Sequence, residues 1–250
     1  MKKIFLSIAL LCAASWVAPT VATAQNLVPI PLKMASAQGQ PLVWQNVGQI
    51  NCPDELANEK AHLLRILADR AGITTLNDNG TAQITLSIDT SLNDDEAYTL
   101  SIDENGVNIA GKTAAGVFYG IMTMEQLMID DNASARCIET NPITIEDAPR
   151  THVRELMVDP CRIFVPYERL KEIVPEMARY KLNSIHLHLV DDQAWRIEIK
   201  KYPQLIEKST SRVGMDDMLI PISGYYTQEQ MKDFVKYCAQ YHVMVVPEIE

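Results

Sequence analysis

The stretch IHLHLVDD, residues 185–192, decides the fold of the second half of the chain. Apolar residues alternate with other residues along it, as in a buried strand, and it ends at two carboxylates, Asp191 and Asp192. Similar apolar runs at residues 156–158 and 243–246 also end close to acidic residues. We therefore expect three short buried strands, each with polar side chains just beyond its carboxyl end.

Amphipathic helices are predicted between these strands. The first begins at Pro166 and carries apolar residues at helical spacing, although Pro175 should kink it. Thr227 and Gln230 have the spacing of a capping box at the start of the second helix. This alternation predicts parallel strands with right-handed crossovers. No glycine-rich turn follows the first strand, which disfavours a dinucleotide or P-loop site and favours an α/β barrel over an open sheet.

The first half of the chain predicts a small α+β unit. A helix is expected from Pro53 to Gly72, and alternating residues on both sides of a turn at 103–106 predict a hairpin. A second helix is expected around residues 118–128. The segment 141–149 contains two prolines and no strong helical pattern, so we interpret it as an inter-domain connection. The first helix is predicted to bury Leu56, Leu63, Leu64, Ile66 and Leu67 on one face.

Residues 1–24 have the features of a secretory signal peptide. Two lysines precede an apolar stretch, and an Ala-Thr-Ala cleavage site occupies residues 22–24. The apolar stretch is too short to span a membrane, and no later segment reaches spanning length. We therefore expect an exported protein, periplasmic or extracellular, with a small α+β domain at residues 25–145 and a barrel domain at residues 150–250.

The composition is that of an acidic globular protein. The chain has 22 Lys and Arg against 32 Asp and Glu, a formal net charge of −10, and no basic cluster, which argues against binding to nucleic acid or to an anionic membrane surface. Four cysteines lie outside the signal: Cys52, Cys137, Cys161 and Cys238. An oxidising compartment permits disulfides among them, and their spacing predicts no metal knuckle.

Polar residues near the strand ends could carry chemistry. His186 and His188 share one face of a strand, so with nearby carboxylates they could bind a transition metal, or they could be hydrogen-bonded inside a barrel. Asp191 and Asp192 could act as an acid and a base, or as a helix cap and a solvated loop carboxylate. Arg162 could bind vicinal hydroxyls or a carboxylate through its fork of donors, or form a structural ion pair. These residues alone predict a polar site at a barrel rim without naming a reaction.

Several of these motifs resemble family 20 β-N-acetylhexosaminidases. The resemblance is carried, in the family's order, by Gly111 and residues 118–127 in the first half, then by 154–164 (RELMVDPCRIF), 180–183, 186–196 (HLHLVDDQAWR), 199–203, 225–229 and 246–250 (VPEIE). It implies a small α+β domain followed by a (β/α)8 barrel. It also implies a retaining exo-glycosidase that acts on glycans with terminal N-acetylglucosamine or N-acetylgalactosamine, with the substrate's 2-acetamido group as nucleophile.

The resemblance further implies roles for two residues. Arg162 would hold the 3- and 4-hydroxyls of the terminal sugar, and Asp191 would be a supporting carboxylate, coupled through a histidine to the acid/base glutamate. The aspartate before that glutamate would orient the acetamido group. No cofactor or metal is implied, and His186 and His188 would be structural.

The sequence departs from the family pattern at two places. Pro160-Cys161 replaces the usual small or aliphatic residues before the arginine, and neither the family's third-strand histidine nor its Asp-Glu pair occurs within the 250 residues. We therefore expect the first three βα units of a truncated barrel, in a chain that is inactive alone. A protein that binds amino sugars without cleaving them is the alternative, and a metal-dependent hydrolase on a small α/β sheet is a third hypothesis. The oligomeric state is left open.

Overall fold

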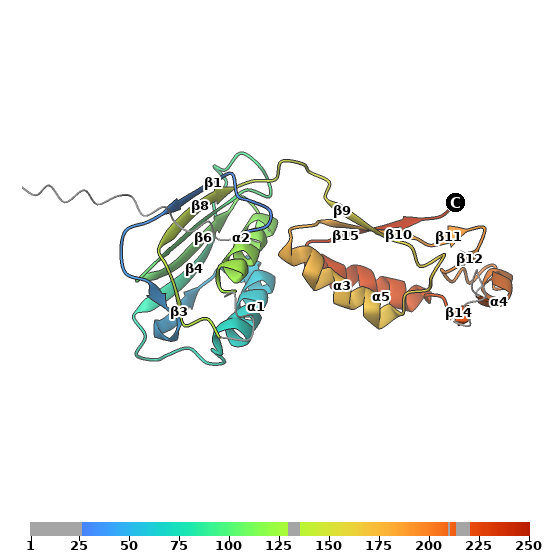
Figure 1. Cartoon of the computed structure of the whole chain (residues 1–250), viewed down its shortest axis with the longest axis horizontal. Helices are drawn as coiled ribbons and strands as arrows, with labels where there is room; N and C mark the ends of the chain where they lie inside the picture. Colours follow the sequence, from blue (N-terminus) through green and yellow to red (C-terminus); the bar gives the residue numbers. More distant parts are fainter. Residues whose placement is uncertain (1–26, 130–135, 210, 214–220) are drawn as a thin grey trace, which may run out of the picture.

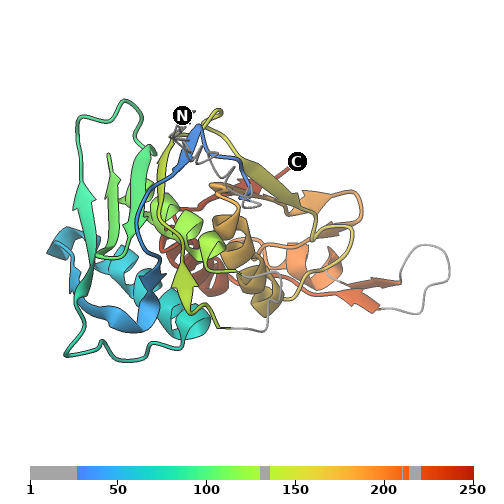
Figure 2. The same ribbon diagram turned by 60° about the vertical axis from the view of Figure 1, so that its left-hand side comes forward.

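The computed structural model describes residues 27–129, 136–209, 211–213 and 221–250. The predicted signal peptide at residues 1–24 lies outside them. The described residues form two units, each a sheet with helices on one face, and an extended connection leads from β8 of the first to β9 of the second (Figure 1). Helix α2 of the first unit packs against α3 of the second (Figure 2).

The first unit contains a six-stranded mixed sheet in the order β1-β8-β5-β6-β4-β3. Its main elements are β1 (Lys33–Ser36), β3 (Val47–Asn51), α1 (Ala57–Ile66), β4 (Ala82–Ile88), β5 (Tyr98–Asp103), β6 (Gly106–Gly111), α2 (Ala114–Leu127) and β8 (Ile143–Asp147). Short elements complete it: β2 (Leu42–Val43), which pairs with β7 (Glu139–Thr140), and helical turns at Trp44–Asn46, Asp54–Leu56 and Leu67–Ala71.

The predicted hairpin is confirmed, because β5 and β6 pair antiparallel and close at Asp103 and Gly106. Gly106 has a φ of +139°, and a Cβ there would collide with the backbone of Gln83 on the neighbouring strand β4. Only glycine can adopt this positive φ without strain and also leave room for the Gln83 backbone.

Two expectations for this unit are wrong. Segment 141–149 is not wholly a connection, because Ile143–Asp147 forms β8 between β1 and β5 and buries its two isoleucines. Such a short alternation does not stand out in a sequence. Leu64 is 43% exposed, since it lies about 100° around the helix from its buried neighbour Leu63. The predicted helix end is confirmed, because Gly72 adopts the left-handed conformation with φ 70°.

Helix α2 is buried on nearly all sides. One face packs against β5 and β6, and another packs against α3 and the turn after α5. In that turn, the ring centroids of Tyr241 and His242 lie 6.5 and 5.0 Å from that of Phe118. A helix between two layers has little solvent-exposed face, so its sequence is apolar almost throughout.

The second unit contains a three-stranded parallel sheet in the order β15-β10-β9. Its elements are β9 (Glu155–Val158), α3 (Tyr167–Arg179), β10 (Ser184–His188), β11 (Val190–Asp191), β12 (Ala194–Trp195), α4 (Gln204–Ser209), β13 (Ser211–Val213), β14 (Pro221–Ser223), α5 (Gln228–Ala239) and β15 (Met244–Glu248). The predicted parallel order is confirmed. Strands β9 and β15 are the two edges of this sheet, so the described residues form an open sheet and not a closed barrel.

The helices of the second unit begin where the sequence predicts. Helix α3 follows Pro166 and runs through Pro175 to Arg179. The capping box of α5 is confirmed: the Thr227 side chain accepts from the Gln230 backbone N–H at 3.1 Å, and the Gln230 side chain accepts from the Thr227 N–H at 2.9 Å. Both helices cover the same face of the parallel sheet (Figure 1).

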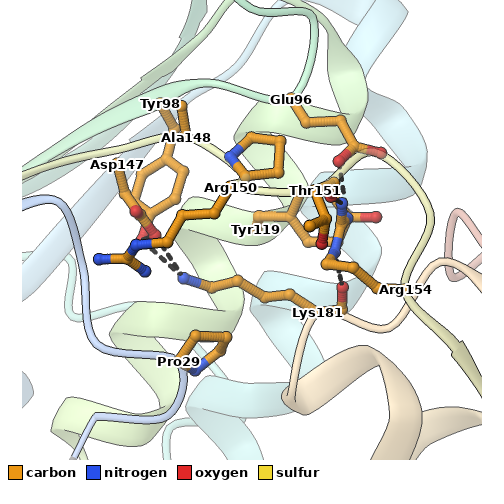
Figure 3. A pocket seen from close by; sticks show the side chains of 11 residues that line it. Pro29, Glu96, Tyr98, Tyr119, Asp147, Ala148, Arg150, Thr151, Arg154 and Lys181 are labelled. Carbon is orange, nitrogen blue, oxygen red and sulfur yellow. Dashed lines mark hydrogen bonds and ion pairs between the residues drawn. The ribbon is translucent and has the colours of Figure 1, made fainter.

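Polar contacts join the two units around a cavity of about 190 Å³ (Figure 3). Lys181, from the second unit, is 7% exposed and donates to Tyr98 Oη and Asp147 Oδ2 of the first unit, both at 2.9 Å. Arg154, just before β9, donates to Glu96 Oε2 at 2.6 Å. The starts of β9 and β10 are therefore tied to the first unit.

The four cysteines outside the predicted signal are free thiols in the structure. Cys161 and Cys238 are buried, and burial raises the pKa of the Cys238 thiol to about 12. Among the described residues, no helix combines the length and the apolar character needed to cross a membrane.

Candidate active site

Three parallel strands bring polar residues together at the carboxyl-terminal end of the sheet. The register pairs His188 at the end of β10 with Glu248 at the end of β15, and Val158 of β9 with Leu187. Because the strands are parallel, the residues just beyond their carboxyl ends lie together, as in other α/β folds. Asp159, which follows β9, therefore lies close to the end of β10.

The two residues predicted from the sequence, Arg162 and Asp191, are brought into direct contact. Arg162 Nη2 donates to Asp191 Oδ2 at 2.5 Å, and Nη1 donates to Asp159 Oδ2 at 2.6 Å. Asp159 Oδ1 also accepts from the Arg162 backbone N–H at 2.9 Å. The Arg162 side chain is nonetheless 54% exposed, so its guanidinium is oriented by two carboxylates and still open to a ligand.

Both carboxylates that hold Arg162 are stabilised in the ionised form. Hydrogen bonds from the Asp192 backbone N–H and from His188 lower the pKa of Asp191, and the charge of Arg162 acts in the same direction. For Asp159, partial burial acts to raise the pKa, but hydrogen bonds from Arg162 outweigh it and the pKa is lowered. Two anionic carboxylates thus flank one cation at the edge of the site.

A buried arginine supports the loop that carries Arg162. Arg196 is fully buried, and its guanidinium donates to the carbonyl oxygens of Pro160 at 2.9 Å, Cys161 at 3.1 Å and Gly224 at 3.0 Å. Pro160 and Cys161, which depart from the family pattern, supply carbonyl groups to this arrangement. Sequence reasoning missed this role, because no feature of a single sequence distinguishes a buried arginine from an exposed one.

The two histidines of β10 form a hydrogen-bonded network on one face of the sheet. His186 Nε2 and His188 Nδ1 both contact Glu248 Oε2, at 2.8 and 2.6 Å, which confirms that the histidines share a face. His188 Nε2 contacts Asp191 Oδ2 at 3.0 Å, and His186 Nδ1 lies 3.3 Å from Glu155 Oε1. Glu248 therefore connects two histidines whose relation to it the sequence did not reveal.

The metal hypothesis fits this arrangement poorly. His188, Asp191 and Glu250 offer potential ligand atoms within 4.8 Å of one another. However, both ring nitrogens of His188 are engaged by carboxylates, and Asp191 Oδ2 is paired with the Arg162 guanidinium. A divalent cation that bound Asp191 would have to displace the guanidinium from Oδ2. The positive charge of Arg162 would still lie nearby and repel the cation. These residues act as an ion-pair network and not as an open ligand set.

The sequence matches one family along both units. The family model described as "Glycosyl hydrolase family 20, domain 2" matches residues 24–148, and "Glycosyl hydrolase family 20, catalytic domain" matches residues 152–250. The chain belongs to glycosyl hydrolase family 20. Its Arg162 and Asp191 thus lie in the part that matches the catalytic domain of this family.

Curated relatives of this family 20 chain are longer proteins. A beta-hexosaminidase of Porphyromonas gingivalis is 36% identical over 234 residues, which cover 90% of this chain and 30% of the relative. A beta-hexosaminidase of Akkermansia muciniphila is 35% identical over 78% of this chain and 36% of the relative. The chain spans about a third of the length of these relatives.

Solved structures of family 20 enzymes have the same fold. An exo beta-N-acetylglucosaminidase of Vibrio harveyi, in complex with N-acetylglucosamine, superposes on this chain with a TM-score of 0.78 at 28% sequence identity. The superposition covers 90% of this chain and 36% of the Vibrio harveyi chain. The N-acetyl-beta-hexosaminidase of Streptomyces plicatus gives a TM-score of 0.78 at 33% identity, covering 90% and 46%. The arrangement of the two units is therefore that of family 20 glycoside hydrolases.

Proposed function

We propose that this chain is the amino-terminal portion of a β-N-acetylhexosaminidase, which releases terminal N-acetylglucosamine or N-acetylgalactosamine from glycans with retention of configuration. The observation that carries the proposal is the Arg162 guanidinium, which is half exposed and fixed between Asp159 and Asp191 at the carboxyl ends of parallel strands. The related enzyme of Vibrio harveyi has been solved in complex with N-acetylglucosamine, which supports an amino sugar as the ligand.

Arg162 binds two neighbouring hydroxyls of the terminal sugar. Each of its terminal nitrogens carries two N–H groups and uses one of them for Asp159 or Asp191. The second N–H of each nitrogen remains for ligand oxygens. A planar fork with fixed spacing suits a pair of vicinal hydroxyls, such as those at positions 3 and 4 of a hexopyranose.

The chemical step uses the substrate's own acetamido group. The acetamido oxygen forms a bond to C1 while the glycosidic C1–O bond breaks, and a glutamic acid gives its proton to the leaving oxygen. Water then adds to C1 while that glutamate takes its proton, and the bond between C1 and the acetamido oxygen breaks. Two successive inversions at C1 retain the configuration. Asp191 supports this glutamate through a histidine. We place that histidine, the glutamate and the aspartate before it in polypeptide that continues beyond Glu250, in keeping with relatives about three times as long.

The same continuation would complete the barrel. Strands β9, β10 and β15 would be its first three strands, and the open edges of β9 and β15 would pair with later ones. An apolar groove beside β15, lined by Ile197, Met231, Val235, Val245 and Pro247, would then be covered. The export predicted from residues 1–24 agrees with a substrate outside the cytoplasm, and we propose a periplasmic or extracellular location.

Hydrolysis of a chromogenic N-acetylglucosaminide tests the proposal. We expect turnover from the polypeptide extended by its downstream coding sequence, and none from the 250-residue chain, because its described residues lack an acid/base glutamate in the family position. Turnover by the 250-residue chain above a mock preparation would refute the placement of the acid/base glutamate beyond Glu250. Binding of N-acetylglucosamine, with no turnover even from the extended polypeptide, would instead establish a non-catalytic amino-sugar-binding protein.

A further inference from the structure

His188 lies between two carboxylates. Its Nδ1 is 2.6 Å from Glu248 Oε2, and its Nε2 is 3.0 Å from Asp191 Oδ2. The side chain is 8% exposed, so water competes little for either nitrogen. The imidazole therefore forms the link between β15 and the carboxylate that contacts Arg162.

This geometry requires both ring nitrogens to donate. An ionised carboxylate only accepts hydrogen bonds, and a neutral imidazole has a single N–H. Protonation of a carboxylate would be the other solution, but Asp191 is already paired with Arg162 at 2.5 Å and Glu248 also contacts His186 at 2.8 Å, and these contacts favour the two anions. An imidazolium at His188 satisfies all the contacts together.

Charge around the ring favours the same state. The groups that face His188 are Glu248 on β15, Asp191 on β11, Asp159 after β9 and Glu250, whose carboxylate lies within 4.8 Å of a His188 ring nitrogen. Arg162, Glu155 and His186 lie one step further along the network. Carboxylates outnumber the single arginine in this set. Hydrogen bonds that His188 donates to the Glu248 and Asp191 carboxylates raise its pKa above the usual range, and burial opposes them only in part.

The contacts also fix how Asp191 is oriented. Its Oδ2 accepts from both Arg162 and His188, and its Oδ1 accepts from the Asp192 backbone N–H at 2.7 Å. Only Oδ1 therefore keeps a well-placed acceptor position for another partner. Rotation of the carboxylate would break several charge-assisted hydrogen bonds at once.

We propose that Glu248 and His188 are positioning residues for Asp191: Glu248 keeps His188 doubly protonated, and His188 together with Arg162 holds one oxygen of Asp191 so that the other faces the catalytic groups. The catalytic consequence rests on the function proposed above. The ionisation state of His188 does not, and it can be measured in the 250-residue chain. His188, assigned from the family resemblance to a structural role, thus gains a second one.

The test is a pH titration of the five histidines by 15N NMR of the 250-residue chain, with His188 assigned from a His188→Gln variant. We expect both ring nitrogens of His188 to be protonated at about pH 7, which requires a titration midpoint above about pH 7, compared with ~6.5 for an ordinary histidine. In Glu248→Gln, an isosteric change that removes the charge, the midpoint should fall by ~1 pH unit or more.

Glu155→Gln is the matched control. It removes a carboxylate that contacts His186 and Ser184 but not His188, so the His188 midpoint should stay at its wild-type value. A neutral, single-tautomer His188 at about pH 7 in the wild type, or an unchanged midpoint in Glu248→Gln, would overturn the proposal. If Glu248→Gln does not fold, the wild-type titration alone decides.

A kinetic measurement separates this proposal from the proposed function. In the extended polypeptide, Glu248→Gln should lower kcat/KM and move the alkaline limb of its pH profile to lower pH, because His188 loses its second proton earlier. A purely structural role would lower kcat/KM without moving the alkaline limb, and this result would overturn the proposed positioning role. Absence of activity in the wild-type extended polypeptide would reject the function, while the NMR titration would still decide the state of His188.

Discussion

Arg162 shows how a surface residue acquires a fixed geometry. Two carboxylates hold the guanidinium plane, and the buried Arg196 holds the loop from which the side chain extends. A lysine at position 162 would keep the positive charge. Its single ammonium group on a flexible chain could not, however, donate hydrogen bonds to two carboxylates and two hydroxyls at once. The proposed sugar binding therefore depends on the shape of the side chain as well as on its charge.

Replacement of Arg162 by lysine in the extended polypeptide should strongly weaken catalysis. Loss of the charge-assisted hydrogen bonds to the sugar corresponds to about 3 kcal/mol, or ~100-fold in kcat/KM. Initial rates on a chromogenic N-acetylglucosaminide measure the effect. Arg169→Lys is the control, because Arg169 lies exposed on α3 and pairs with Glu172 at the surface. Equal losses in both variants would contradict the assignment of Arg162.

At the scale of elements, α1 meets the turn between α5 and β15 through His62. Its Nε2 lies 2.8 Å from the Gln240 carbonyl oxygen, and its Nδ1 lies 3.1 Å from Arg65 Nη2. A carbonyl accepts and a guanidinium donates, so Nε2 carries the proton and Nδ1 carries none. Burial lowers the pKa of His62, and the charge of Arg65 adds to this, so the neutral ring belongs to the folded state.

Acidification should therefore weaken the contact between these elements. The pKa of His62 is lower in the folded chain than the ~6.5 of the unfolded chain, so its contribution to stability is fully present above about pH 6.5 and is lost as the pH falls below that value. Urea unfolding at about pH 7.5 and about pH 5.5 should show a larger loss of unfolding free energy for the wild type than for His62→Gln, which retains a donor for Gln240.

A second pair in the same contact does not mask this effect. Glu59 is 1% exposed and lies 2.7 Å from His242 Nε2. Burial acts to raise the pKa of Glu59, but hydrogen bonds from His242 and Asn58 outweigh it and lower the pKa below its usual range. Glu59 thus stays ionised throughout the window in which His62 is tested. The same pH dependence in wild type and His62→Gln would show that another group is responsible.

At the scale of the whole molecule, a buried ion pair connects the two units. Lys181 and Asp147 have side chains that are 9% and 8% exposed, and Tyr98 completes the contact (Figure 3). Burial lowers the pKa of Lys181, and the attraction of Asp147 offsets only part of that effect. A charge in this position is tolerated because its partner is present.

Removal of the anionic partner should destabilise the chain. Asp147→Ala leaves Lys181 buried without its counter-ion and should lower the free energy of unfolding by about 3 kcal/mol, measured by urea denaturation. The double variant Asp147→Leu with Lys181→Met should recover most of this loss, because it leaves no buried charge. Glu146→Ala is the control: its partner Lys33 is 73% exposed, so a change of about 0.5 kcal/mol is expected. A double variant as unstable as Asp147→Ala would contradict the explanation.

The sequence predicts those features that depend on neighbours along the chain. The β5–β6 hairpin, the left-handed end at Gly72 and the capping box of Thr227 with Gln230 are all confirmed, because turns and caps are set by a few adjacent residues. Strand β8 was missed because it contains only two buried residues, and its assignment depends on pairing with β1 and β5.

For the candidate site, the sequence placed Arg162 and Asp191 at the carboxyl ends of neighbouring strands. Their contact follows from parallel pairing, so periodicity and connectivity sufficed to bring them near each other. The sequence did not predict that Arg196 supports the loop, or that Glu248 links two histidines. Those contacts join residues up to 62 positions apart, and their partners are chosen by the packing of the strands.

By itself, the sequence determined the order of the main helices and of the parallel strands in the second unit, their parallel pairing and the family, because these depend on local periodicity and on motifs read along the chain. The tertiary structure alone decided the ionic network around His188, the burial of Lys181 against Asp147 and the contact of His62 with the turn after α5. Each depends on desolvation and on charges brought together from distant segments, and those quantities exist only once the chain has folded.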